Sequence, residues 1–208
     1  TYINYGMLLS CLIGEDIESG YRFGQLGLQL IEQLQAKRFQ CKAEVTFNAV
    51  LKHWKQHGKN SLDSLQDLVQ TGMESGDIEF ACYSASLYGY QGLLIGIPLD
   101  SIAHRVDEYI ELMQKLKQEY QWNVTRIVRQ AVSNLMLPSK EQCALVGNHF
   151  NETEMLPVFI ENKLTTLVFW IYGCKLILCY LFKDNRQAIK IAKQVAQYES
   201  GAPGVMLI

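Results

Sequence analysis

Residues 77–120 read DIEFACYSASLYGYQGLLIGIPLDSIAHRVDEYIELMQKLKQEY, and they carry the clearest structural signal in the chain. An apolar segment leads into the short turn Gly96-Ile97-Pro98, and an amphipathic segment follows it. Apolar residues recur at helical spacing on both sides of the turn, and Pro98 is typical of the residues that begin a helix. The segment therefore predicts two helices joined by a tight turn, at about 77–95 and 99–120.

The same pattern of helix, turn and helix returns along the chain. Its turns fall at Gly14-Glu15-Asp16, His57-Gly58-Lys59, Gly96-Ile97-Pro98 and Lys183-Asp184-Asn185. A spacing of roughly 40 residues, with a double-length gap before the last turn, is typical of an α-solenoid. We therefore expect an all-α, tetratricopeptide-like superhelix of about ten helices in antiparallel pairs, forming a single helical-repeat domain over residues 1–208.

Apolar periodicity and capping residues give the expected bounds of the helices. These bounds are about 2–13, 17–36, 39–57, 61–75, 77–95, 99–120, 123–137, 153–162, 164–182 and 185–198. Ser61 is expected as the N-cap of the fourth helix. Residues 138–151 carry Pro, Gly and Asn without a helical period, so they predict an irregular insertion.

Three glycines of the second helix, Gly20, Gly24 and Gly27, fall on one helical face. Each glycine lowers the stability of the helix by about 1 kcal/mol relative to alanine. Their presence therefore indicates another role. Small side chains on one face let a neighbouring helix approach closely. We expect a close helix contact there.

The composition indicates which kinds of partner and which cellular compartment to expect. A formal net charge of −2 with scattered Lys and Arg argues against nucleic-acid binding. The longest apolar run, 167–182, is too short to span a bilayer and contains Lys175, so we expect no membrane partner. Six cysteines without a CxxC spacing predict reduced core thiols in a cytoplasmic protein. The sequence begins without Met, which suggests a fragment of a longer chain.

Two pairs of residues have the types that metal sites and nucleophilic catalysis need. His53 and His57 are four apart, but Trp54 stands where a metalloprotease would carry Glu. Cys143 and His149 share the irregular insertion, but no third partner is suggested. Both pairs are better explained as structural residues.

Further catalytic signals are missing from the sequence. The acidic residues Glu15, Asp16 and Glu18 crowd a helix start, where the helix dipole favours them. No GxxxxGK[ST], GxGxxG or GxSxG motif occurs. We therefore expect no catalytic residue, no cofactor and no metal site in this segment, and we expect that it is not an enzyme.

A binding surface is the more natural expectation for such a fold. Concave faces of helical-repeat arrays bind extended peptides or helices. The residues expected near this groove are Asn48, Lys52, Ser86 and Tyr90, with Asn4 or Tyr5. The expected partner is a protein or peptide. Two alternatives stay open: a small-molecule sensor with a pocket near Cys143, His149 and Trp170, and a spacer or oligomerisation element.

Several strings of the sequence resemble one family. They are GYRFGQL at 20–26, HW at 53–54, ESGDIEFA at 74–81, KLKQE at 115–119, RQ at 129–130, NL at 134–135 and KLILCYLF at 175–182. Together they resemble the helical-repeat region of large cyanobacterial-type signalling proteins. These proteins join a serine/threonine kinase-like domain, an AAA-type ATPase, a tetratricopeptide-like segment, a GAF domain and often a sensor histidine kinase.

The resemblance covers nearly the whole chain and rests on packing residues. It implies a scaffold or regulatory segment of a signal-transduction protein, which relays between the ATPase and the output kinase. Neighbouring domains of its own chain are then candidate partners. No kinase or nucleotide motif falls within these residues, so the resemblance carries no catalytic residue into this chain.

Overall fold

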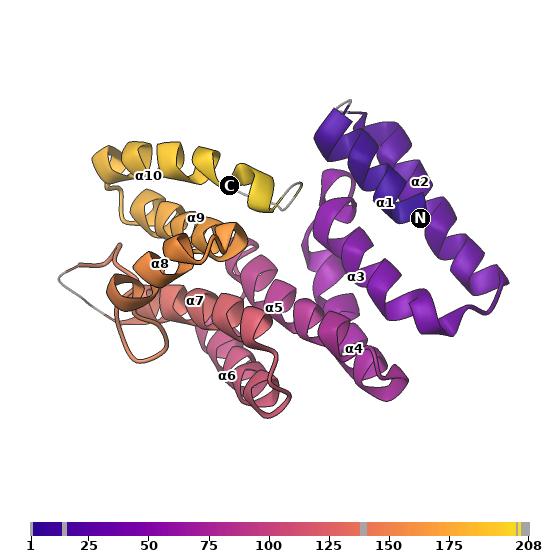
Figure 1. Cartoon of the computed structure of the whole chain (residues 1–208), viewed down its shortest axis with the longest axis horizontal. Coiled ribbons are helices and arrows are strands. Elements are labelled where there is room, and N and C mark those ends of the chain that lie inside the picture. Colours follow the sequence, from indigo (N-terminus) through magenta and orange to yellow (C-terminus); the bar gives the residue numbers. More distant parts are fainter. Residues whose placement is uncertain (1, 14–15, 138–140, 203, 205–208) are drawn as a thin grey trace. The chain divides into compact units, whose positions relative to one another are not determined.

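The computed structural model describes residues 2–13, 16–137, 141–202 and 204, and these residues form an all-α structure (Figure 1). Ten α-helices are present among them. Their bounds are α1 Tyr2–Met7, α2 Ile17–Gln33, α3 Gln40–Val50, α4 Lys59–Ser75, α5 Ile78–Leu94, α6 Leu99–Lys115, α7 Glu119–Met136, α8 Glu152–Glu161, α9 Thr165–Leu181 and α10 Asn185–Gln197. Adjacent helices pack on one another, which confirms the predicted all-α helical-repeat class.

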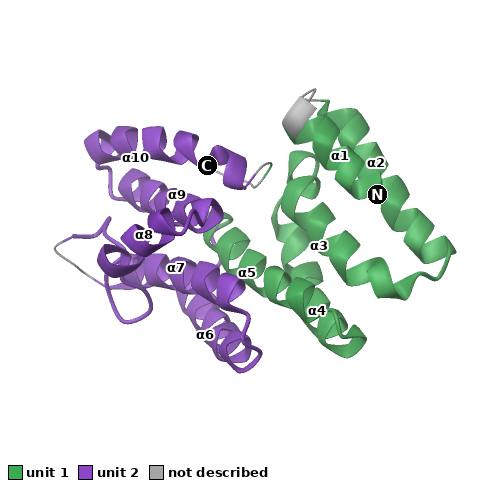
Figure 2. Ribbon diagram, viewed as in Figure 1, with its two compact units in different colours: residues 1–95, 203–206 green, residues 96–202, 207–208 purple. Residues whose placement is uncertain are grey.

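The helices fall into two compact units (Figure 2). Unit 1 comprises residues 1–95 with 203–206, and unit 2 comprises residues 96–202 with 207–208. The sequence predicts one domain over 1–208, and that expectation stays a prediction, because compact units can also be parts of a single repeat array.

Unit 1 is held together by close packing of α1 on α2 and of α4 on α5, with α3 against both pairs. The predicted glycine face of α2 lies where α2 packs against the preceding segment and against α3. A Cβ on Gly20 would lie 1.8 Å from Ser10 Oγ, and one on Gly27 would lie 2.8 Å from Ile3. A Cβ on Gly24 would lie 2.7 Å from side-chain atoms of α3. The expected close approach at these glycines is confirmed.

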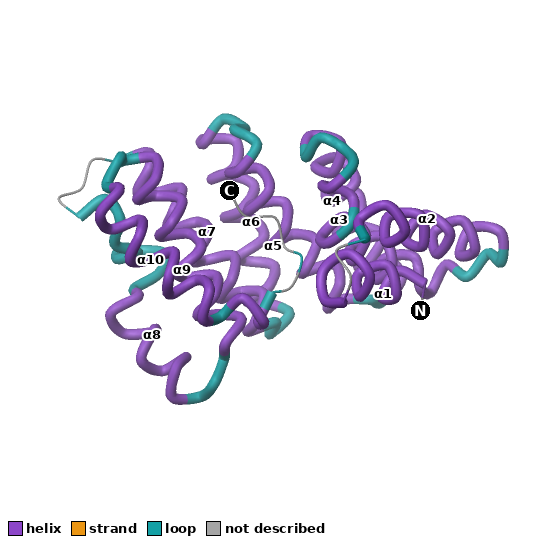
Figure 3. Tube along the Cα trace, turned by 90° about the horizontal axis from the view of Figure 1, so that it is seen from above, coloured by secondary structure: helices purple, strands orange, loops and turns teal. Residues whose placement is uncertain are grey.

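Unit 2 is built in the same way from packed helix pairs. The helix pairs α6 with α7 and α9 with α10 pack closely, α7 also packs on α9, and α8 covers part of α9. Its interior is formed by fully buried side chains, which include Ile102, Met113, Ile127, Leu145, Phe150 and Leu178. Figure 3 shows that short loops join most helices, while the chain between α7 and α8 takes a longer path.

Four of the helix ends share one turn geometry. Gln35, Lys117, Lys163 and Lys183 have positive φ angles of 49°, 56°, 56° and 60°. In each turn the next residue donates its backbone N–H to a carbonyl five residues earlier, as Gln118 does to Met113 at 3.0 Å. These are Schellman turns, which satisfy the last helical carbonyls. Gly76 and Gly96 also have positive φ and end α4 and α5.

Several predicted helix bounds need correction. α3 ends at Val50, not at His57, because Leu51 leaves the helical region with φ −121° and a 3₁₀ turn, Lys52–Trp54, follows. The first helix changes after Met7 into a π-helical segment, Leu8–Ile13. Ser61 lies inside α4 and is buried at 1% exposure, so it is not the N-cap.

The boundary between the sixth and seventh helices was also misplaced. α6 stops at Lys115 and α7 starts at Glu119, because the Schellman turn at Lys117 falls inside the segment expected to be helical. Residues 138–140 of the predicted insertion, and Gly14 and Glu15 of the first turn, lie outside the described residues. Among the described helices, none combines the length and the apolar character that crossing a bilayer requires.

Candidate functional site

The loop between α7 and α8 is ordered by its own backbone over residues 141–151. Val146 and Asn151 form an isolated antiparallel bridge, and the N–H of Gly147 donates to the carbonyl of Phe150 at 3.0 Å. Leu145 and Phe150 are buried, at 0% and 1% exposure. Residues 141–151 of the expected irregular insertion therefore form a compact loop anchored by two apolar side chains.

Two buried amides on α7 bind this loop. Gln130 Oε1 accepts hydrogen bonds from the backbone N–H groups of His149 and Phe150, at 3.1 and 3.3 Å. Its Nε2 donates to Asn134 Oδ1 at 2.8 Å, and Asn134 Nδ2 donates to the carbonyls of Gln142 and Ala144. Buried polar groups need such partners, so the pair explains why α7 carries amides on its inner face.

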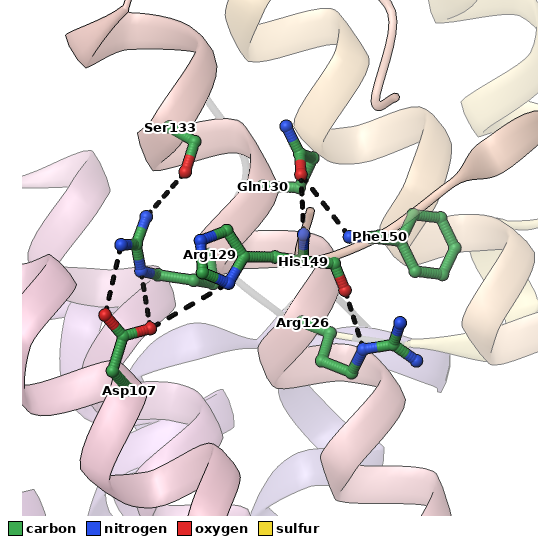
Figure 4. A network of polar contacts seen from close by, with 7 residues as sticks. All are labelled: Asp107, Arg126, Arg129, Gln130, Ser133, His149 and Phe150. Atoms are coloured by element: carbon green, nitrogen blue, oxygen red, sulfur yellow. Dashed lines mark hydrogen bonds and ion pairs between the residues drawn. The ribbon is translucent and has the colours of Figure 1, made fainter. Parts of the chain in front are cut away.

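Charged side chains of α6 and α7 form a second layer around the loop (Figure 4). Arg129 donates through Nε and Nη2 to the two carboxylate oxygens of Asp107, at 2.8 and 3.1 Å, and through Nη1 to Ser133 Oγ at 2.6 Å. Such a bidentate contact fixes the orientation of the guanidinium as well as its distance from the carboxylate. It links α6 to α7 beside His149.

His149 lies 3.9 Å from Asp107 but does not form a strong ion pair with it. Burial lowers the pKa of His149, and the nearby Arg129 and Arg126 lower it further, against the raising effect of Asp107. The imidazole is therefore neutral at pH 7. The His149 carbonyl accepts from Arg126 Nε at 2.6 Å, and the Arg126 guanidinium lies 4.1 Å from the Trp122 ring centroid.

A polar cavity of about 580 Å³ lies beside residues 141–144 of the same loop. Lys175 of α9 and Glu152 of α8 line it and pair at 2.6 Å, with only 14% and 10% of their side chains exposed. Glu152 Oε2 is buried and has no hydrogen-bond partner among the described residues. Cys143, at the start of the loop, lines this cavity too.

Most of the cysteines are structural thiols in the interior, as the sequence predicts. Burial raises the pKa of Cys41 and Cys174 to about 12 and that of Cys82 to about 11. All six cysteines are unbridged. Cys11 and Cys143 are half-buried, and of these two Cys143 lines the polar cavity.

An apolar pocket of about 530 Å³ lies in unit 1 between α1, α2 and α3. Its lining includes Ile3, Leu30, Ile31, Leu34 and Phe39, and Lys42 is the charged residue that lines it. Tyr2 and Phe39 are about half exposed, at 46% and 48%, and Leu34 is 73% exposed.

Sequence reasoning missed this apolar pocket. The sequence signal for it is weak, because Leu34 continues the apolar stripe of Leu30 and Ile31, and only the folded structure shows that Leu34 and Phe39 stay exposed. Large apolar side chains that gather at an exposed pocket typically mark a binding surface.

The groove expected at Asn48, Lys52, Ser86 and Tyr90 is not found as an open surface. Asn48, Ser86 and Tyr90 are buried, at 3%, 5% and 1% exposure. Asn48 donates to Ser64 Oγ of α4 at 3.4 Å, and its carbonyl accepts from Gln91 of α5. Lys52 is half-buried and donates to Asn48 Oδ1 and the Asn60 carbonyl. The helical register expected from the sequence assigned Asn48, Ser86 and Tyr90 to an open surface, whereas they face the interior.

The other sequence candidates also resolve into structural roles. His53 is half-buried beside Trp54, at 5.0 Å between ring centroids, and burial lowers its pKa to about 4. His57 Nδ1 accepts from the backbone of Lys59. His53 and His57 are not on one helix, since α3 ends before both. In the part of the chain that the structure describes, no group of three or more His, Cys, Asp or Glu side chains could hold a metal ion.

No family model, no curated protein and no solved structure matches this chain. Its function therefore has to be inferred from its own pockets and contacts.

Proposed function

We propose that this chain is a non-catalytic helical-repeat scaffold that binds an apolar segment of a protein partner in the pocket between α1, α2 and α3. The exposure of Leu34 and Phe39 at the mouth of that pocket carries the proposal. A soluble surface gains little from a 73% exposed leucine unless something covers it, and burying such a side chain contributes about 1.5–3 kcal/mol.

Charge at the rim indicates the chemistry of the partner. Arg38 lies over the Phe39 ring at 4.5 Å, and Lys42 lines the pocket beside it. A partner segment with apolar anchors and flanking acidic residues would complement this rim. An amphipathic helix has that pattern, and helix-in-groove binding is a common mode of recognition by helical proteins.

The wider setting rests on the resemblance. We propose that the segment belongs to a larger cytoplasmic signal-transduction protein and that the partner segment comes from a protein, including neighbouring domains of the same chain. The six unbridged cysteines support a reducing compartment. The segment itself would supply binding energy from a few apolar anchors and no chemistry.

Photo-crosslinking at the pocket tests the proposal. A benzoyl-phenylalanine placed at Phe39 is expected to capture apolar peptides that carry acidic residues, identified by mass spectrometry of the crosslinked product. The matched control carries the same group at Ile189, an apolar residue of α10 that is 63% exposed.

Two results decide the outcome. A captured segment, made as a purified peptide, should bind the wild-type chain and lose at least tenfold in affinity for Leu34→Asp. Crosslinks at Phe39 that are no more frequent or more uniform than those at Ile189 would show that the pocket binds no partner.

A further inference from the structure

Two cysteines of unit 2 lie near each other beside the polar cavity. Cys143 belongs to the 141–151 loop, is half-buried and lines the cavity. Cys179 lies on α9 with 0% exposure. It is one turn after Lys175 and one turn before Phe182, and both of these residues line the same cavity as Cys143. A small reactant that enters the cavity can therefore reach Cys143, whereas Cys179 is shielded from solvent.

The other cysteines lack this arrangement. Cys174 is also on α9, but five residues of helix place its side chain about 140° around the axis from that of Cys179. In unit 1 the Cys41 thiol donates to the Leu68 carbonyl at 3.6 Å, and Cys11 donates to a backbone carbonyl at 4.0 Å. Geometry therefore singles out one pair of thiols.

We propose that Cys143 and Cys179 form a reversible disulfide when the chain meets a low concentration of a peroxide, and that this bond fixes the 141–151 loop to α9. The loop is already bound to α7 through Gln130 and Asn134. The disulfide would add a covalent link from the same loop to the neighbouring helix. The proposal concerns unit 2 and does not rest on partner binding at the pocket of unit 1.

The reaction takes place in two steps. The thiolate of Cys143 attacks one oxygen of hydrogen peroxide, which forms the S–O bond and breaks the O–O bond. The departing hydroxide takes the proton that the Cys143 thiol released and leaves as water. Cys143 is then a sulfenic acid.

In the second step the sulfur of Cys179 attacks the sulfur of Cys143. The S–S bond forms, the S–O bond breaks, and the departing hydroxide takes the Cys179 proton and leaves as a second water. Two thiols are oxidised and one peroxide is reduced. An excess of a small dithiol reverses the change by thiol–disulfide exchange.

Burial and neighbouring groups assign the order of these steps. Burial, together with the neighbouring Cys143 and Asp184, raises the pKa of Cys179 to about 12, so Cys179 is a poor first nucleophile. Lys175, one turn earlier on α9 and in the same cavity, acts in the opposite direction and lowers the pKa of Cys179. Its ammonium group would stabilise the Cys179 thiolate as it forms during the second step.

A peptide map of the full chain tests the proposal. The reduced protein is treated with one equivalent of hydrogen peroxide, free thiols are blocked with N-ethylmaleimide, and the chain is digested with trypsin without reductant. Cleavage at Lys and Arg leaves Cys143 in peptide 141–163, Cys174 in 164–175 and Cys179 in 176–183. The expected product is 141–163 linked to 176–183, lighter by two hydrogen atoms and separated again by dithiothreitol.

Thermal unfolding gives a second measurement. The linked chain should unfold at a temperature higher by about 5 °C or more than the reduced chain, because the bond closes a long loop. Cys143→Ser and Cys179→Ser should lose the linked peptide and the shift, whereas Cys174→Ser, the control on the same helix, should keep both.

Three results would overturn the proposal. They are oxidation of Cys143 to sulfinic acid without any linked peptide, equal linkage of Cys143 to Cys174 and Cys179, and linkage that forms only after the chain is unfolded in urea. If a serine variant fails to fold, as judged by its circular dichroism, the map of the wild-type chain decides by itself.

Discussion

Gln130 shows how much of the 141–151 loop depends on one side chain. It is 4% exposed, accepts from two backbone N–H groups and donates to Asn134. A Cβ on Gly147 would lie 2.6 Å from Gln130 Nε2, so the loop has no room for a larger residue there. Because each buried N–H left unpaired costs about 1–3 kcal/mol, the amide of Gln130 selects this loop conformation over its alternatives.

His53 gives unit 1 a pH dependence of defined sign. Burial lowers its pKa from 6.5 to about 4, and its Nδ1 has no hydrogen-bond partner among the described residues. The folded state therefore favours the neutral imidazole. The stability this supplies is complete above about pH 6.5 and is lost as the pH falls toward 4. Between pH 7 and pH 5 we expect a loss of about 1–2 kcal/mol, after allowance for partial exposure.

Urea unfolding of wild type and His53→Gln at several pH values measures this effect. The variant cannot take up the proton, so the difference in free energy of unfolding between the two chains should shrink or reverse between pH 7 and pH 5. A difference that stays constant over that range would show that His53 does not titrate with folding.

At the level of the elements, turns with a positive φ recur at the helix ends. Gln35, Gly76 and Lys117 are evenly spaced along the chain, and each has a positive φ. A non-glycine residue in that region costs about 1 kcal/mol, which the Schellman hydrogen bonds offset.

Lys117→Gly should therefore raise the free energy of unfolding by about 1 kcal/mol. Lys115→Gly is the matched control: it removes the same charge two residues earlier, inside α6, where glycine should destabilise by about 0.5–1 kcal/mol. Chemical denaturation of both variants gives the comparison. Destabilisation of similar size in both would mean that the turn at Lys117 stores no backbone strain.

These helices were largely predictable from the sequence, and the turns were less so. The sequence located α5, α9 and α10 within about one or two residues, since α5 and α9 are long apolar segments and α10 carries a clear apolar stripe. Lys117 failed as a signal because lysine is a good helix former, and only the hydrogen bonds of the folded turn reveal its positive φ.

The candidate sites were harder to predict, because each joins residues that are distant in sequence. Cys143 lies near Cys179, and the loop that carries Cys143 is bound by Gln130, which precedes it on α7. Periodicity within one helix contains no information on such contacts. The groove residue Asn48 was misplaced for a related reason, since an outer and an inner helical face differ by one or two residues of register.

At the scale of the whole molecule, each compact unit has a hydrophobic interior of its own. In unit 1, Leu51 and Leu65 are fully buried in clusters formed by α1 to α5. In unit 2, Met113, Ile127 and Leu178 are equally buried. A segment that closes its own core has the main requirement for folding alone.

We therefore expect residues 96–202 to fold when expressed without the rest of the chain. The cut falls at Gly96, whose positive φ ends α5, so no helix is interrupted. The fragment should be helical by circular dichroism and unfold cooperatively in urea, because its buried contacts are internal.

A fragment that begins at Ile127, in the middle of α7, is the control: it lacks α6 and should be unfolded or aggregated. If residues 96–202 bind a hydrophobic dye and show no cooperative transition while the full chain does, the two units share one folding transition and the single-domain expectation is the better description.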